Sequence, residues 1–132
     1  MKTLPLRLNP GDDLRRAIED AVATQGLQAA FVLQGIGSLA DASLRLAGAE
    51  TATPVPGASE ILTLAGSVAP GASHLHASLA DAQGRVIGGH LPYGCRVRTT
   101  AELLLVLLPA WVFTREHDSG TGYAELQIKA AG

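Results

Sequence analysis

Apolar and polar residues alternate along much of this chain, which is the pattern of half-buried β-strands. Residues 4–8 (LPLRL) alternate loosely and predict a first strand, and residues 60–69 (EILTLAGSVA) alternate clearly. Two segments near the C-terminus, 111–117 (WVFTREH) and 122–130 (GYAELQIKA), are predicted to be strands joined by the turn DSGTG. The apolar run at 102–109 (ELLLVLLP) predicts a strand with both faces covered, although its periodicity alone also allows a buried helix.

One segment has the period of a helix. Within residues 13–25, apolar residues recur at helical spacing and charged residues fall on the other side. Asp12 or Asp13 can cap the first turn, and Gly26 is a suitable C-terminal stop. The pattern therefore predicts an amphipathic helix after the first strand.

The middle of the chain predicts further strands and one loop. Residues 31–33 indicate a buried strand, and Gly35 and Gly37 indicate a kink or bulge after it. The segment 42–48 (ASLRLAG) is a second strand or a continuation, and 49–59, with two prolines, is predicted to be a loop. Together the elements predict a single α+β domain over residues 1–132, mostly antiparallel sheet with one or two helices.

Composition adds the first indication of partners. The chain has 47% hydrophobic and only 17% charged residues, so we expect part of its apolar surface to be buried between subunits; a well-covered monomer is the alternative. The net charge of −2 disfavours a main role in binding the phosphate backbone of nucleic acids. The basic clusters are also few, at Arg15–Arg16 and Arg96–Arg98. DNA is therefore a weakly supported partner.

Cysteine content and apolar run length predict the compartment. A lone cysteine, Cys95, excludes an intrachain disulfide and fits a reducing cytosol. The longest apolar run, 103–113, is well short of the roughly 20 residues of a membrane helix. We expect a cytoplasmic protein with no membrane partner.

Three of the four histidines lie in the segment HLHASLADAQGRVIGGH, residues 74–90. Strand side chains alternate, so His74 and His76 share a face. A three-residue turn with Gly84 in the left-handed position pairs Asp81 with Arg85 and places His76 opposite His90. A two-residue turn would instead turn His90 to the other face, and a bulge at Gly88–Gly89 would also disturb the register.

Three converging imidazoles predict a metal site. They suit Zn²⁺, and also iron, nickel or copper, and they leave a position for water or substrate. The alternative is a polar strand face or an interface with satisfied histidines. Gly88 and Gly89 are expected to leave room beside the site for a ligand or a partner chain.

Other residues could complete such a site. Glu102 is a candidate fourth ligand, general base or hydrogen-bond partner of a histidine, or else a surface residue at a strand start. Tyr93 and Arg98 could bind an anionic ligand near the metal, or could lie on a solvated edge. Cys95 is more typical of a small buried residue, and His117 of a solvated one.

Several segments resemble the plants-and-prokaryotes-conserved (PPC) domain. They are GSLADASLRL, EILTLAG, HLHASLADAQGRVIGGHLPYG and TTAELLL, and the similarity extends from about residue 7 to residue 127. The resemblance implies an α+β PPC-domain fold assembled as a homotrimer. It also implies a metal on His74, His76 and His90, because similar bacterial members can carry one there. The fold is further similar to that of acetolactate decarboxylase, which holds zinc with an H-x-H strand and a third histidine.

The same resemblance implies DNA binding as an alternative function. Bacterial stand-alone members are often described as candidate DNA-binding proteins, and plant members carry Arg-Gly-Arg-Pro minor-groove elements. This sequence has no such element, and residues 57–62 read GASEIL where plant members have GRFEIL. We therefore expect a trimeric protein that binds a divalent metal, with a small anionic or carbonyl-containing molecule as its ligand or substrate. The alternatives are a DNA-binding or transcription-associated module and a structural trimer.

Overall fold

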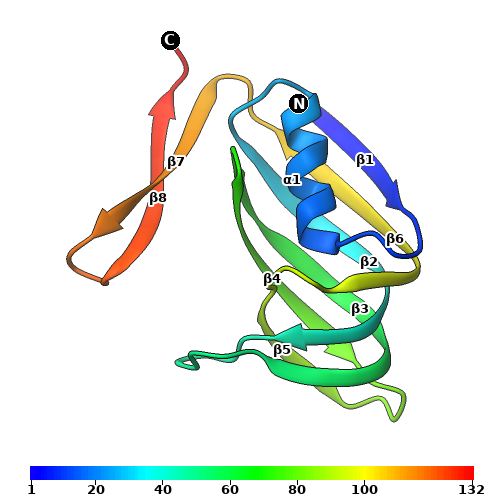
Figure 1. Ribbon diagram of the computed structural model, residues 1–132. Helices are drawn as coiled ribbons and strands as arrows, with labels where there is room; N and C mark the ends of the chain where they lie inside the picture. Colours follow the sequence, from blue (N-terminus) through cyan, green and yellow to red (C-terminus); the bar gives the residue numbers. More distant parts are fainter.

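The computed structural model describes residues 1–132 and contains eight strands and one helix. Six strands form one antiparallel sheet in the order β1-β6-β2-β3-β4-β5, and β7 and β8 form a separate two-stranded sheet. The sheet curves around the helix, and the two-stranded hairpin projects to one side (Figure 1). This is the predicted α+β class. The element bounds are β1 Lys2–Leu8, α1 Leu14–Thr24, β2 Ala30–Leu44, β3 Thr53–Ala69, β4 Ala72–Ala80, β5 Val86–His90, β6 Arg96–Leu107, β7 Trp111–Asp118 and β8 Tyr123–Ala130.

The helix α1 covers the inner face of the six-stranded sheet. The Asp13 side chain caps it by accepting a hydrogen bond from the Arg16 backbone N–H at 3.1 Å. Leu14, Ile18 and Val22 are buried in the main core, together with inward side chains of the sheet. Gly26 follows with a φ of +67°, which ends the helix as predicted. No helix in the structure is both long and apolar enough to cross a bilayer.

Of the two middle strands, β2 confirms the sequence-based prediction, which allowed a continuation through residues 42–44, and β3 departs from it. β2 runs without a break through residues 42–44, and its pairing with β6 shifts on both sides of Gly35, as the glycines predicted. β3 begins at Thr53, so the predicted loop 49–59 is too long and that prediction was wrong. Pro54 and Pro56 are tolerated because this part of β3 pairs only with β2, and β4 joins it from Glu60 onward.

The strand β6 is covered on one face only. Leu103, Leu105 and Leu107 are buried, whereas Leu104 between them is 37% exposed. Within the single chain, the prediction that both faces of this strand are covered was therefore wrong. Leu104 belongs to the outer face of the sheet, by which we mean the face opposite α1.

The β7–β8 hairpin is attached to the outer side of the sheet by a small second core. Buried Phe113 of β7 packs edge-on against Phe31 of β2, with ring centroids 5.7 Å apart. The Phe113 backbone N–H also donates to the Gln28 carbonyl at 3.0 Å. These contacts place the Phe113 side of the hairpin against the outer face of β2 and β3.

Candidate metal centre

The turn between β4 and β5 fixes the register of the histidines. The Asp81 N–H donates to the Arg85 carbonyl and the Gly84 N–H donates to the Asp81 carbonyl, both at 2.9 Å. Gly84 has a φ of +80°, and the Asp81 carboxylate accepts the backbone N–H groups of Gln83 and Arg85. The three-residue turn is therefore confirmed, and His76 lies directly opposite His90.

The three predicted histidines come together on the outer face of the sheet. One nitrogen from each of His74, His76 and His90 lies within 4.8 Å of the other two. The Nε2 atoms of His74 and His76 are only 3.1 Å apart. Two nitrogens bound to the same zinc at about 2.0–2.1 Å can be at most about 4.2 Å apart. Small rotations of the imidazole side chains would therefore bring all three nitrogens within reach of one zinc ion.

His90 is held by an unusual backbone contact. Its N–H and carbonyl both pair with Arg45, which follows the end of β2. A Cβ on Gly89 would lie 2.7 Å from the Arg45 carbonyl oxygen, so this glycine makes room for the Arg45 backbone rather than for a ligand. The sequence-based expectation of free space at Gly89 was wrong for this reason.

The surroundings keep two of the imidazoles neutral. Burial, followed by the nearby Arg45 charge, lowers the pKa of His90 to about 4. Burial, followed by the neighbouring His76, also lowers the pKa of His74. The His90 Nδ1 atom is buried and has no hydrogen-bond partner. A neutral imidazole with an unsatisfied nitrogen is the form that binds metal, so the donor set fits a transition-metal ion.

An open cavity of about 770 Å³ adjoins the histidines. Its walls come from β2, β3 and β4 on the sheet and from both strands of the hairpin. Sequence reasoning missed Arg115 and Glu125, which line this cavity together with His74 and His76. No local pattern could have found them, because the hairpin reaches the sheet only through tertiary packing.

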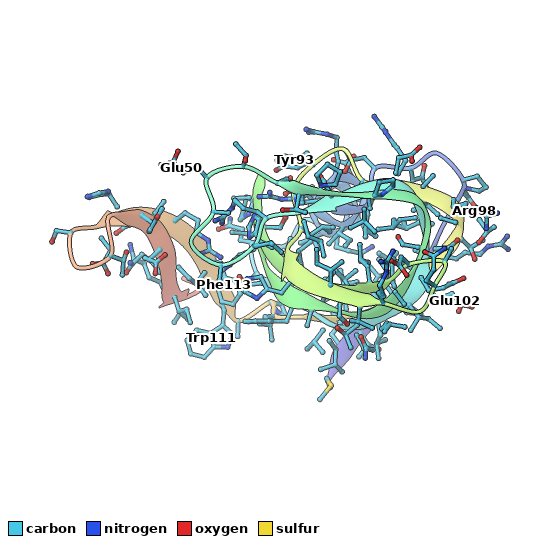
Figure 2. The ribbon with its side chains drawn as sticks, turned by 90° about the horizontal axis from the view of Figure 1, so that it is seen from below. Glu50, Tyr93, Arg98, Glu102, Trp111 and Phe113 are labelled. Atoms are coloured by element: carbon cyan, nitrogen blue, oxygen red, sulfur yellow. The ribbon has the colours of Figure 1, made fainter.

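Three other predicted site residues lie elsewhere. The Tyr93 hydroxyl donates to both carboxylate oxygens of Glu19 on α1, at 2.7 and 2.9 Å. Glu102 lies opposite Arg7 and Ile36 and lines a second cavity of about 700 Å³. Arg98 is exposed near the start of β6. Figure 2 shows Arg98 and Glu102 at the end of the molecule far from the β7–β8 hairpin, so the structure does not group them with the histidines.

Cys95 is buried, as its type suggested, and His117 is exposed on β7. The Cys95 thiol donates to the Ser43 carbonyl at 3.3 Å. Burial raises the pKa of this thiol. Neither residue is part of the histidine cluster.

The family follows from a comparison with known proteins. The model of the Plants and Prokaryotes Conserved (PCC) domain matches residues 1–109. The chain belongs to this family. The resemblance seen in the sequence is thereby confirmed for the PCC domain, and the further likeness to acetolactate decarboxylase stays a prediction. The β7–β8 hairpin lies beyond the matched residues.

Relatives of this PCC-domain chain include both longer and similarly sized proteins. It is 46% identical to a Synechococcus protein named bifunctional protein GlmU, over 98% of this chain but only 20% of that protein. It thus spans about a fifth of the length of the curated relatives it matches. A hypothetical protein from Salmonella has a solved structure with 38% identity and a TM-score of 0.92, covering 98% of this chain and 94% of the other.

A solved structure from Archaeoglobus fulgidus is described as a metal-containing protein. It shares 29% identity and a TM-score of 0.80, covering 96% of this chain and 94% of that one. Two proteins named as candidate DNA-binding proteins, from Bacteroides thetaiotaomicron and Ralstonia eutropha, are 17% and 22% identical, and their likeness shows the fold alone.

Proposed function

We propose that this PCC-domain protein binds one divalent transition metal, most simply zinc, through His74, His76 and His90. The observation that carries the proposal is the convergence of three imidazole nitrogens within 4.8 Å on neighbouring strands. Iron and nickel suit the same donor set. The metal-containing relative from Archaeoglobus supports the proposal at the level of the family.

The site would leave coordination positions for a small molecule. Three protein ligands are typical of zinc sites that bind water or substrate, whereas structural zinc sites are closed by four. A bound ion there would polarise an oxygen of its ligand or activate water. The cavity beside the histidines has the volume of a small-molecule site. The proposed ligand class is a small anionic or carbonyl-containing molecule.

We further propose that the chain assembles as a homotrimer. Several large apolar side chains are exposed on the outer face or at its margin, more than a small monomer needs to display. They are Phe31, Leu33, Ile36, Leu62 and Leu104. Burying them between copies would also cover the second face of β6, which the sequence pattern already indicated.

The lone cysteine supports a reducing compartment, and we propose the cytoplasm. Cys95 is a buried free thiol with no cysteine to pair with.

The metal proposal is tested with matched histidine variants. His76→Ala removes the central member of the cluster, and His117→Ala removes an exposed histidine outside it. Loss of one ligand of three should weaken zinc affinity by about 100-fold or more, measured by competition with a chromogenic chelator. His117→Ala should leave the affinity unchanged, and equal affinity in both variants would refute the site.

DNA remains the alternative partner, and the same preparations test it. A DNA-binding module would bind duplex DNA at usable affinity, with a steep loss of affinity as salt is added. Such binding, in protein that retains no metal, would replace the metal proposal.

A further inference from the structure

One cation of the β7–β8 hairpin lies against the histidine cluster. The Arg115 Nη2 atom donates to the Ser67 hydroxyl at 2.9 Å. Ser67 of β3 lies directly opposite His74 of β4, and opposed residues of neighbouring strands share a face with their Cβ atoms about 5 Å apart. The guanidinium group is therefore brought beside His74, and Arg115, His74 and His76 line the same cavity.

The charge of Arg115 is not used by the fold. The three ion pairs of the chain involve Arg15, Arg85 and Lys129, and none includes Arg115. Glu125 lines the cavity as well, but it makes no ion pair with Arg115. A guanidinium group has five N–H donors, and the Ser67 hydroxyl, its one side-chain partner, is neutral. Several donors thus remain for a ligand in the cavity.

We infer that Arg115 binds the carboxylate of a small organic acid. A further oxygen of the same acid, outside that carboxylate, reaches the ion held by the histidines. This inference rests on the proposed metal site. Arginine presents two parallel N–H donors that match a carboxylate. Neutral imidazoles leave the two positive charges of the ion uncompensated, and Arg115 adds a third. The Glu125 carboxylate in the same cavity offsets only one of them, so an anion is still the complementary ligand. Phe31, Leu33 and Leu126 supply apolar walls for a short carbon skeleton.

The carboxylate-binding residue comes from a segment that the family match does not cover. That match ends at residue 109, and Arg115 lies in β7, which starts at Trp111. The metal ligands thus belong to the shared domain, while the proposed ligand specificity belongs to the hairpin that follows it.

The experiment uses lactate and its uncharged amide, lactamide, as probes of the zinc-loaded 132-residue chain. Zinc content is measured first, and each probe is then titrated while the protein amide signals are followed by NMR. Wild type should bind lactate in preference to lactamide. Because a hydrogen-bonded charge contributes about 10- to 100-fold in affinity, Arg115→Gln should weaken lactate binding by that factor at unchanged zinc content.

The controls separate charge, position and folding. Arg98→Gln removes an exposed arginine at the other end of the molecule and should leave lactate binding unchanged. Arg115→Lys keeps the charge and the aliphatic stem but not the paired donors, so it should weaken lactate binding less than Arg115→Gln. If the glutamine variant does not fold, Arg115→Lys replaces it in the comparison with wild type.

The outcomes are distinct for the two proposals. If zinc is retained but both Arg115 variants bind lactate as wild type does, or wild type binds lactamide equally well, the role of Arg115 is overturned and the metal site stands. If wild type holds no zinc, the proposed function fails first, and the inference fails with it.

Discussion

At the scale of single residues, Gly66 shows how closely the strands around the site approach each other. Gly66 has a φ of +150°, and a Cβ there would collide with the carbonyl oxygen of His74. Gly66→Ala should therefore lower the free energy of unfolding by about 2 kcal/mol or more, measured by urea denaturation.

The control for this prediction is another glycine with a positive φ but with no atoms close to the place of a Cβ. Gly48 has a φ of +72°, and no atom lies within 4 Å of the place that a Cβ would occupy, so Gly48→Ala should cost only about 1 kcal/mol of left-handed strain. Similar losses in the two variants would contradict a close approach at His74.

The Cys95 thiol gives a prediction with a pH dependence. Burial raises its pKa, so at pH 8 a smaller fraction is thiolate than in the unfolded chain, and the group is also inaccessible. Its reaction with Ellman's reagent should be at least about 100-fold slower in the folded protein than in urea. Because the folded pKa is raised, the associated stability is present below the unfolded thiol pKa and is lost as pH rises through the folded value. Rapid labelling of folded protein at pH 8 would contradict this burial.

The histidine cluster could be predicted from the sequence because it depends on local rules. Alternation places His74 and His76 on one face, and Gly84 selects the turn that brings His90 opposite. Arg115 could not be predicted, because its approach to His74 depends on the Phe113–Phe31 contact between distant segments. Tyr93 and Glu102 were assigned to the site only because they lie close to the histidines in the sequence.

At the scale of elements, α1 is joined to β4 by one buried carboxylate. Glu19 accepts hydrogen bonds from the Ser73 hydroxyl at 2.6 Å and from Tyr93. The Arg15 guanidinium lies 4.1 Å from the centre of the Tyr93 ring. Tyr93 therefore helps to anchor the helix behind the strand that carries His74.

Removal of the Tyr93 hydroxyl should affect stability and not metal binding. Tyr93→Phe should lower the free energy of unfolding by about 1 kcal/mol, because Glu19 loses a donor, and zinc content should be unchanged. Tyr123→Phe is the matched control, since Tyr123 is 72% exposed and should show no change in stability. A loss of zinc in Tyr93→Phe at unaltered stability would instead give Tyr93 a direct role in the site.

Element boundaries were predictable where a local signal marks them. Asp13 and Gly26 bound the helix, and the glycines at 35 and 37 mark the irregular part of β2. The start of β3 was missed because two prolines normally end a strand. They fit here because only one edge of that segment is paired. Which edge of a strand is paired depends on the whole sheet, so the local sequence could not predict it.

At the scale of the whole molecule, the outer face of the sheet joins the site to the proposed assembly. Val106, Phe31, Ser67 and His74 form one row across four neighbouring strands. The apolar end of the row belongs to the exposed hydrophobic surface, and its polar end belongs to the histidine cluster. Assembly through the apolar end would leave the histidines beside, or within, the contact between copies.

The trimer prediction is tested on this surface. Light scattering should give three times the chain mass of 13.6 kDa for wild type. Leu104→Glu places a charge on the outer face and should shift the mass toward that of one chain. Ala23→Glu changes an exposed residue of α1, on the other side of the sheet, and should remain trimeric. A monomeric wild type would contradict the proposed assembly.

The central claim is that three named histidines bind one metal ion, and imidazole nitrogen NMR tests it most directly. Zinc is added to one equivalent while the ring ¹⁵N signals of all four histidines are recorded. The account predicts that the signals of His74, His76 and His90 shift and saturate together at one equivalent, while those of His117 stay in place. Signals of the three that do not change, or zinc binding that appears at His117, would contradict it.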